Sequence, residues 1–186
     1  LVGNSANNLL NGGAGNDTFV LVSDDARDLL LGAAGVDTVD YTAVAASLTV
    51  NLGSAATVVV TGSGTTALLS DTVNGIENFI GGSGNDNIVG TAAANVLSGG
   101  LGNDILAGGS GRDTLDGGAA DDTLTGGTGT DHLTGGDGAD VFDYNGAIES
   151  GFGAAVRDLI ADFVAGTDKL DFSTLDANTG LTGNQA

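Results

Sequence analysis

Residues 81–143 form seven consecutive nine-residue units: GGSGNDNIV, GTAAANVLS, GGLGNDILA, GGSGRDTLD, GGAADDTLT, GGTGTDHLT and GGDGADVFD. Five of them match the pattern G-G-x-G-x-D-x-U-x, in which U is a large apolar residue. One unit has Ala120 in place of its fourth-position glycine, and another has Asn95 in place of the sixth-position aspartate. A short period repeated this often predicts a solenoid, in which each repeat is one layer of a stack.

The N-terminal part continues the pattern more weakly. GGAGNDTFV (12–20) is complete, whereas GNSANNLLN, SDDARDLLL and GAAGVDTVD keep only parts of it, among them Asp28 and Asp37 at the sixth position. TVNGIENFI (72–80) places Glu77 in the same phase. Residues 41–71 break the pattern, and their β-branched runs SLTVNL (47–52) and TVVVTG (57–62) predict two strands.

This pattern predicts an all-β protein, a parallel β-roll of stacked 18-residue coils with a C-terminal cap. The first six residues of a unit form a turn, and residues seven to nine form a short strand whose apolar member points inward. Two units make one coil, so strands of successive coils lie about 4.8 Å apart. We divide the chain into N-terminal degenerate repeats, a non-repetitive β excursion, the main roll and a cap, spanning residues 1–40, 41–80, 81–143 and 144–186.

The stacking brings the sixth-position side chains of alternate units into two columns. Asp86, Asp104, Asp122 and Asp140 line one edge, while Asn95, Asp113 and Asp131 line the other. Like charges at this spacing repel by about 1 kcal/mol per pair even in water, so the columns favour cations. Calcium suits them because it takes six to eight oxygen ligands, backbone carbonyls included.

We predict that the ligands are the sixth-position side chains together with the second- and fourth-position carbonyls. Four main sites are expected, between Asp86/Asp104, Asp104/Asp122, Asp122/Asp140 and Asp113/Asp131, with weaker ones at Asn95/Asp113 and Asp17/Asp37. The carbonyl donors are those of Gly82, Gly84, Gly100, Gly102, Gly109, Gly111, Gly118, Ala120, Gly127, Gly129, Gly136 and Gly138.

These repeats resemble those of the repeats-in-toxin (RTX) family, and this resemblance also implies calcium and a β-roll. The tail RDLIADFVAGTDKLDFSTLDANTGLTGNQA (157–186) resembles the C-terminal cap of serralysin-type secreted metalloproteases. Members of that group pass through type I secretion systems by means of an uncleaved C-terminal signal. The resemblance therefore implies an extracellular or cell-surface location and a secretion signal that lies beyond Ala186. Phe142, Phe152, Phe163 and Phe172 are expected to pack in the cap.

Composition excludes several other functions. With 24 acidic and 4 basic residues the net charge is −20, so the chain should repel nucleic acid and anionic membranes. It has no cysteine for thiolate metal sites, and no apolar run long enough to span a membrane. Neither the zinc-protease motif H-E-x-x-H nor the nucleophile elbow G-x-S-x-G occurs. The single His132 and Arg112 are expected to be exposed.

We therefore expect a non-enzymatic module that folds on extracellular calcium and supports the type I secretion and stability of an attached effector. Two alternatives stay open from the sequence. One is a structural module of a surface-layer protein or adhesin. The other is a carbohydrate-associated module of a secreted polysaccharide-modifying enzyme.

Overall fold

The computed structural model describes residues 1–22, 27–53, 58–63, 70–146 and 157–174. These residues form seventeen β-strands and no helix, so none of them lies in a helix that could span a membrane. The strands are β1 Leu9–Ala14, β2 Thr18–Val20, β3 Leu29–Ala34, β4 Thr38–Asp40, β5 Ser47–Asn51, β6 Val58–Ser63, β7 Ser70–Asn74, β8 Asn78–Ile80, β9 Asn87–Val89, β10 Val96–Leu101, β11 Ile105–Gly111, β12 Thr114–Ala119, β13 Thr123–Gly129, β14 His132–Asp137, β15 Val141–Asp143, β16 Leu159–Ile160 and β17 Lys169–Asp171.

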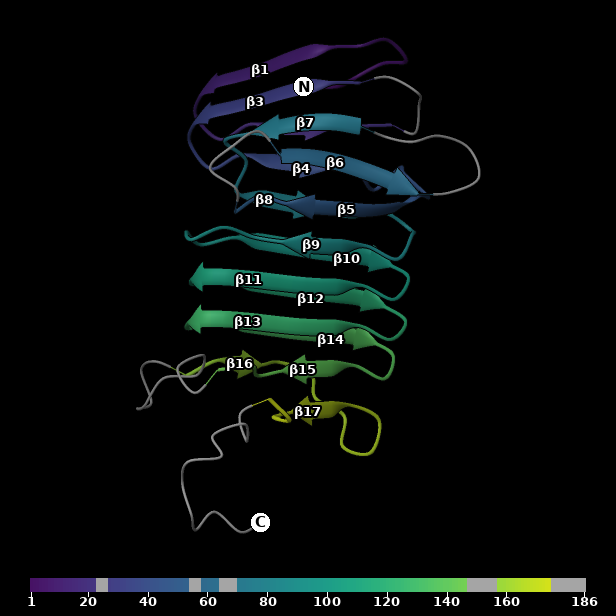
Figure 1. The fold of residues 1–186 in the computed structure, drawn as a ribbon, viewed down its shortest axis with the longest axis vertical. Helices are drawn as coiled ribbons and strands as arrows, with labels where there is room; N and C mark the ends of the chain where they lie inside the picture. The colour runs from purple at the N-terminus through teal and green to yellow at the C-terminus, as the bar shows by residue number, and fades with distance from the viewer. Residues whose placement is uncertain (23–26, 54–57, 64–69, 147–156, 175–186) are drawn as a thin grey trace.

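The strands form two stacked sheets, and the chain winds between them from one end of the molecule to the other (Figure 1). One sheet has the order β1-β3-β7-β6-β5-β9-β11-β13-β15-β17, and the other has the order β16-β14-β12-β10-β8-β4-β2. Val96 pairs with Thr114, and Thr114 pairs with His132, at a spacing of 18 residues. The predicted parallel β-roll of 18-residue coils is confirmed.

The regular strands are longer than predicted. β10, β12 and β14 do not end at the ninth position of a unit but run on through the first three residues of the next. The paired backbones continue past the glycines, as in the pairing of Gly100 with Gly118. Only the remainder of each unit therefore forms the turn.

The core of the regular coils consists of two facing stacks of eighth-position side chains. Leu97, Leu115 and Leu133 stack in one sheet, and Ile88, Leu106 and Leu124 stack in the facing one, all of them buried. Burying one such side chain contributes about 1.5–3 kcal/mol. A coil supplies two of them, so the apolar core is thin, and the two edges must contribute much of the remaining stability.

Residues 41–74 add strands β5, β6 and β7 to only one of the sheets, and β8 follows in the other. The predicted strands over 47–52 and 57–62 are confirmed as β5 and β6. β6 runs antiparallel between β5 and β7, while β5 pairs in parallel with β9 and β7 with β3. In the other sheet β8 contacts β4 and β10 directly.

The C-terminal cap continues both sheets after residue 157. β16 pairs with β14, and β17 pairs with β15. Phe142 is buried and its ring lies 6.1 Å from that of Phe163, while the rings of Tyr144 and Phe172 stack at 5.4 Å. Phe142 has the predicted packing role, whereas Phe163 and Phe172 make ring contacts but stay 40% and 49% exposed; Phe152 lies outside the described part of the chain.

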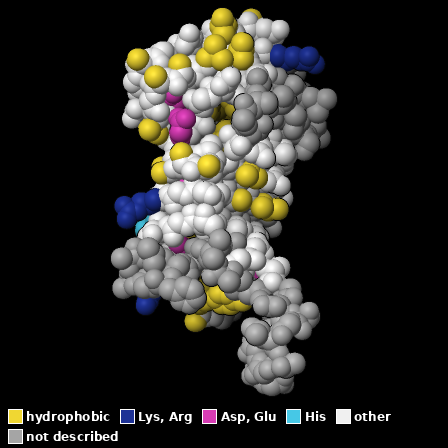
Figure 2. Space-filling view, turned by 60° about the vertical axis from the view of Figure 1, so that its left-hand side comes forward, with side chains coloured by type: hydrophobic (Ala, Val, Ile, Leu, Met, Phe, Trp, Pro, Cys, Tyr) yellow, Lys and Arg dark blue, Asp and Glu magenta, His cyan; other side chains and the backbone are white. Residues whose placement is uncertain are grey.

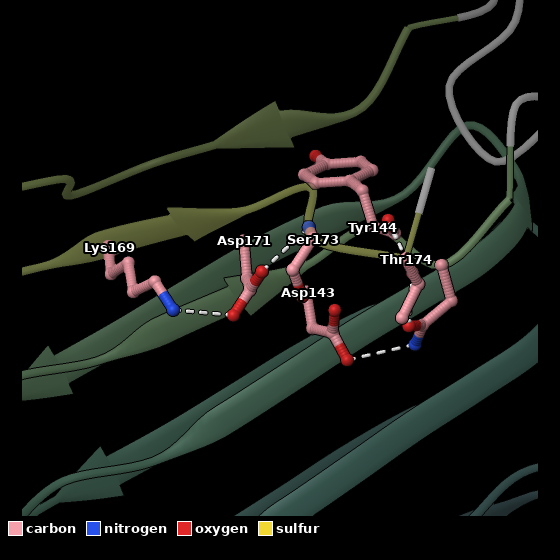
Figure 3. A network of polar contacts seen from close by, with 7 residues as sticks. Asp143, Tyr144, Lys169, Asp171, Ser173 and Thr174 are labelled. Carbon is pink, nitrogen blue, oxygen red and sulfur yellow. Dashed lines mark hydrogen bonds and ion pairs between the residues drawn. The ribbon is translucent and has the colours of Figure 1, made fainter. Parts of the chain in front are cut away.

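Figure 3 shows the polar contacts at this end. The Lys169 Nζ atom lies 2.5 Å from Asp171 Oδ2, and the Ser173 N–H donates to Asp171 Oδ1. The hydrogen bond from Lys169 lowers the pKa of the Asp171 carboxyl below its usual range. Asn145 and Thr174 bond to each other and, in turn, Asn145 donates to Asp143. Side-chain hydrogen bonds therefore stabilise the cap in addition to strand pairing.

Candidate metal centres

The sixth-position aspartates form two hydrogen-bonded columns, one on each edge of the roll. We call edge one the side that holds Asp86, and edge two the side that holds Asp113. On edge one, the Asp86 N–H donates to Asp104 Oδ1 (2.6 Å), and the Asp104 N–H donates to Asp122 Oδ1 (2.7 Å). The Asp122 N–H donates in turn to Asp140 Oδ1 (3.0 Å). Each aspartate thus accepts a bond from the coil before it.

Edge two follows the same rule. The Asn95 N–H donates to Asp113 Oδ1 (2.8 Å), and the Asp113 N–H donates to Asp131 Oδ1 (2.8 Å). In the N-terminal repeats the Asp17 N–H donates to Asp37 Oδ1 (2.8 Å). In the structure these residues lie on two edges, in the groups that the sequence predicted.

The second carboxylate oxygen is buried and has no hydrogen-bond partner among the described residues. This applies to the Oδ2 atoms of Asp17, Asp37, Asp104, Asp113, Asp122, Asp131 and Asp140. An unsatisfied buried charge costs several kcal/mol. Rows of such oxygens in register lack a partner that a cation or a proton could supply.

The first glycine of each unit makes room for this carboxylate. A Cβ atom on Gly99 would lie 2.1 Å from Asp104 Oδ2, and one on Gly117 would lie 2.4 Å from Asp122 Oδ2. The aspartate side chain therefore folds back over the glycine of its own turn. A larger residue at the first position would displace the oxygen from the column.

Backbone carbonyls of the predicted ligand positions also stack along the edges. A Cβ atom on Gly118 would lie 2.1 Å from the Gly100 oxygen, and one on Gly138 would lie 2.1 Å from the Ala120 oxygen. The Gly82 oxygen already accepts the Leu101 N–H (2.9 Å), and its other lone pair stays available because a carbonyl has two. Carboxylate and carbonyl oxygens thus occur together on edge one, and on edge two a Cβ atom on Gly127 would likewise lie 2.1 Å from the Gly109 oxygen.

Burial and mutual repulsion perturb the column carboxylates. Burial, with the neighbouring column charges, raises the pKa of Asp104 and of Asp122 to about 7. Burial also raises the pKa of Asp86 and of Asp113 to about 6, and it raises the pKa of Asp131 and Asp140. Near neutral pH, ionisation of the column carboxyls is therefore unfavourable unless cations compensate their charge.

The donor set fits calcium. All of the candidate groups are oxygens, which hard cations prefer, and calcium accepts carboxylates and carbonyls together in an irregular shell. No group of three or more His, Cys, Asp or Glu side chains that could hold a metal ion occurs in the described residues. Such a group is not needed here, because each candidate site draws two side chains from successive coils and takes its other donors from the backbone.

Edge two has different side chains where the sixth position of a unit is not an aspartate. Asn95 turns its amide back so that Oδ1 accepts the Thr91 N–H (2.6 Å), while Nδ2 donates to the Glu77 oxygen (2.5 Å). Glu77 accepts the Asp37 N–H at Oε2 (2.9 Å), so its longer side chain takes the place of an aspartate. The phase assigned to Glu77 from the sequence is confirmed.

Two alanines adopt the left-handed conformation that the repeat reserves for glycine. Ala120 has φ +87° and Ala33 has φ +76°. This conformation costs a non-glycine residue about 1–2 kcal/mol. The stack therefore imposes the turn geometry even where the sequence lacks the glycine.

Fifth-position side chains form a second ladder that runs in the opposite direction. Asn85 Oδ1 accepts the Asn103 N–H (3.1 Å), and Asp121 Oδ1 accepts the Ala139 N–H (2.9 Å). Arg112, at the same position in its unit, is exposed, and so is His132 on its strand, as predicted. Figure 2 shows few acidic side chains on the face in view, in keeping with the burial of the column carboxylates.

Comparison with known families agrees with this geometry. Residues 29–184 match the family described as Peptidase M10 serralysin C terminal, which covers most of the chain. The chain belongs to this serralysin C-terminal family. Residues 1–21 match the RTX calcium-binding nonapeptide repeat. A comparison with individual characterised proteins gave no match.

Membership of the serralysin C-terminal family confirms the resemblance inferred from the repeats and the tail. Together with the RTX match it identifies a calcium-binding β-roll module of the kind found in secreted proteins that use type I secretion. The matches cover this C-terminal domain and the repeats, and neither is to a catalytic peptidase domain.

The serralysin-type roll also contains column members that the repeat pattern did not single out. Asp71 accepts the Asp28 N–H (2.8 Å), Asp158 accepts the Asp131 N–H (2.9 Å) and Asp168 accepts the Asp140 N–H (3.2 Å). Asp162 accepts the N–H groups of Gly135 and Gly136. The common feature is an aspartate two positions before a large apolar residue, as in D-T-V, D-L-I and D-K-L, without the flanking glycines.

Proposed function

We propose that this chain is a calcium-triggered folding module that supports the type I secretion and stability of an attached exported effector and is not itself an enzyme. The observation that carries this proposal is the pair of columns with unpartnered, buried Oδ2 atoms. Without cations these columns oppose folding, and with calcium they hold the coils together.

The proposed ion sites lie between Asp104 and Asp122, between Asp122 and Asp140, and between Asp113 and Asp131. A fourth, between Asp86 and Asp104, would draw on the free oxygen of Asp104 alone, because both oxygens of Asp86 accept backbone N–H groups. Weaker sites are proposed at Asp17/Asp37, where both Oδ2 atoms lack partners, and at Asn95/Asp113.

The energetics favour a switch. Calcium that binds only the folded chain stabilises it by RT ln(1 + [L]/Kd) per site, on the order of 1 kcal/mol when calcium exceeds Kd several-fold. Extracellular calcium modules have Kd values of about 10⁻⁴–10⁻³ M. A chain with several such sites stays unfolded at cytoplasmic calcium, as passage through a secretion channel requires, and folds outside the cell.

Far-UV circular dichroism of the chain, titrated with calcium from a chelated start, tests this proposal. We expect a cooperative transition from coil to β-structure at about 0.1–1 mM calcium, and none with magnesium over the same range, because magnesium demands a rigid octahedral shell. A chain that is folded in chelator, or unfolded at several millimolar calcium, would contradict the switch.

A further inference from the structure

The geometry points to residues 41–51 as an internal cap that closes the edge-one column in the middle of the roll and so divides it into two separate arrays of aspartates, of which the C-terminal one holds the proposed calcium sites. One array contains Asp28 and Asp71, and the other begins at Asp86. The calcium dependence in this inference rests on the proposed function. The closure of the column is argued from hydrogen bonds and packing alone.

On the N-terminal side, a tyrosine hydroxyl closes the column. The buried Tyr41 hydroxyl donates to Asp71 Oδ2 (2.6 Å), while Asp71 Oδ1 accepts the Asp28 N–H (2.8 Å). Both carboxylate oxygens of Asp71 are therefore engaged by protein donors. Tyr41 is held in place by stacking on Phe79 at 5.4 Å and by the bond from its own N–H to the Ile80 oxygen.

On the C-terminal side, a leucine stands where the repeat would place an aspartate. β5 pairs with β9 in the register Thr49 to Asn87, so Leu48 lies directly above Asp86 in the column. The Leu48 N–H donates to Asp86 Oδ1 (2.7 Å), but the buried Leu48 side chain offers no oxygen in return. Asp86 Oδ2 accepts the Gly82 N–H (3.2 Å), so this carboxylate is also satisfied.

The turn that follows is shaped by the same segment. The Ser83 N–H donates to the Val44 oxygen (3.0 Å), and the Asn85 N–H donates to the Ser47 hydroxyl (3.0 Å). A Cβ atom on Gly82 would lie 1.9 Å from the Val44 oxygen. Gly82 and Gly84 lack the positive φ of Gly100 and Gly102 one coil later, although the turn 81–86 matches the repeat in full. Residues 41–51 thus supply a calcium-independent end against which the next coils stack.

Edge two has no such closure in the part of the chain that the structure describes. Asp37 bonds to Glu77, and Glu77 to Asn95, which continues to Asp113. The two arrays are therefore divided on edge one alone, and any coupling between them passes through edge two and the sheets.

Hydrogen exchange of the full chain, read by mass spectrometry across a calcium titration, tests the division with Tyr41→Phe. Loss of a buried hydrogen bond to a carboxylate should lower the protection of β3 and β7 roughly 10- to 100-fold. The loss should persist at saturating calcium, while the calcium midpoint for β11 and β13 stays within about twofold of the wild type. Thr42→Ala, at the exposed neighbour that bonds only to Asp40 among described residues, is the control.

Two results would overturn the inference. Calcium could restore the protection of β3 and β7 in Tyr41→Phe, which would mean that an ion can occupy the place of the hydroxyl. Alternatively, the midpoint for β11 and β13 could shift together with β3 and β7, which would mean that the column is continuous.

The reciprocal variant Asp104→Asn keeps the test decisive if Tyr41→Phe does not fold. It should raise the midpoint for β11 and β13 several-fold and leave β3 and β7 unchanged, and equal changes in both regions would contradict the division. If the wild type shows no calcium-dependent protection of β11 and β13, the proposed switch fails. The cap would then be judged by the protection of β3 and β7 in Tyr41→Phe alone.

Discussion

The regular coils between β10 and β14 and the excursion at residues 41–80 build the same roll by different chemistry. In the regular coils, each aspartate satisfies one oxygen with a backbone N–H and leaves the other without a partner. In the excursion, a tyrosine hydroxyl, a leucine and a longer glutamate occupy the corresponding places. On the proposed function, the repeated units depend on an external ion for part of their stability, whereas the excursion uses the chain's own donors and packing.

The largest expected effect is that of pH, because it acts on all the columns at once. The pKa of Asp104 and Asp122 is about 7 in the calcium-free fold, against about 3.9 in an unfolded chain. A raised carboxyl pKa means that the fold binds protons more tightly. This contribution to stability is complete below about pH 4 and is lost as the pH rises through about 7.

Protons should therefore replace calcium in part. We expect the calcium-free chain to hold more β-structure at pH 5 than at pH 8. Because the unfolded chain is already ionised at pH 5.5, the calcium midpoint of folding should not rise at this pH, and it should fall where protonation alone favours the fold. Circular dichroism titrations at several pH values measure both effects. Equal β-structure in the calcium-free chain at pH 5 and at pH 8 would show that the column carboxylates are not perturbed.

Gly99→Ala tests the close packing of the regular turn. The new Cβ atom would lie 2.1 Å from Asp104 Oδ2 and 2.7 Å from the Gly117 oxygen. We expect a loss of about 3 kcal/mol in the free energy of unfolding at saturating calcium, at the top of the range for overpacking. Urea denaturation measures it, with Ser98→Ala as the neighbouring control. A loss below about 1 kcal/mol would mean that the carboxylate can move without harm to the site.

Asp122→Asn separates the charge of a column residue from its hydrogen bond. The amide oxygen can still accept the Asp104 N–H, but two of the proposed ion sites lose a carboxylate. Two weakened sites should lower the calcium-bound stability by about 2 kcal/mol at calcium several-fold above Kd.

Asp121→Asn is the matched control, because Asp121 is adjacent and exposed, and its oxygen bonds to Ala139 outside the column. Equal calcium midpoints for the two variants, measured by calorimetric titration, would argue against ions in the edge-one column.

The smallest expected effect is a gain. Ala120→Gly relieves the left-handed strain at φ +87° and should stabilise the calcium-bound chain by about 0.5–1 kcal/mol, after the greater flexibility of glycine in the unfolded chain is subtracted. Ala119→Gly, at the preceding residue without a positive φ, should instead destabilise. Thermal denaturation of both variants compares them, and a lower melting temperature for Ala120→Gly would contradict the strain.

The repeats made most of the roll predictable, because one spacing fixes both the inward position and the turn. The apolar eighth residues, such as Leu106 and Leu115, and the two columns follow directly from it. The place of Glu77 at an aspartate position could be predicted from its spacing alone, although the turn before it is shorter than the others. The antiparallel placement of β6 was not predictable, since β-branched runs indicate strands but not their partners.

The closing role of the excursion could not be predicted, because its residues do not match the repeat pattern. Tyr41 occupies the place where the repeat has its first glycine, and Leu48 the place of the aspartate. Nothing in the spacing shows that a hydroxyl reaches Asp71 across the fold, because that contact joins residues 30 apart through tertiary packing. The D-x-apolar pattern of Asp71–Val73 was the one available indication that the column resumes there.

A crystal structure of the chain grown in calcium, with anomalous data collected to locate the ions, would test the assignment of the columns. We predict anomalous peaks between Asp104 and Asp122, between Asp122 and Asp140, and between Asp113 and Asp131, each within about 2.3–2.6 Å of the Oδ2 atoms. An intact roll with no peaks at these three places, or with ions only on the outer faces of the sheets, would contradict the proposal that calcium completes the aspartate columns.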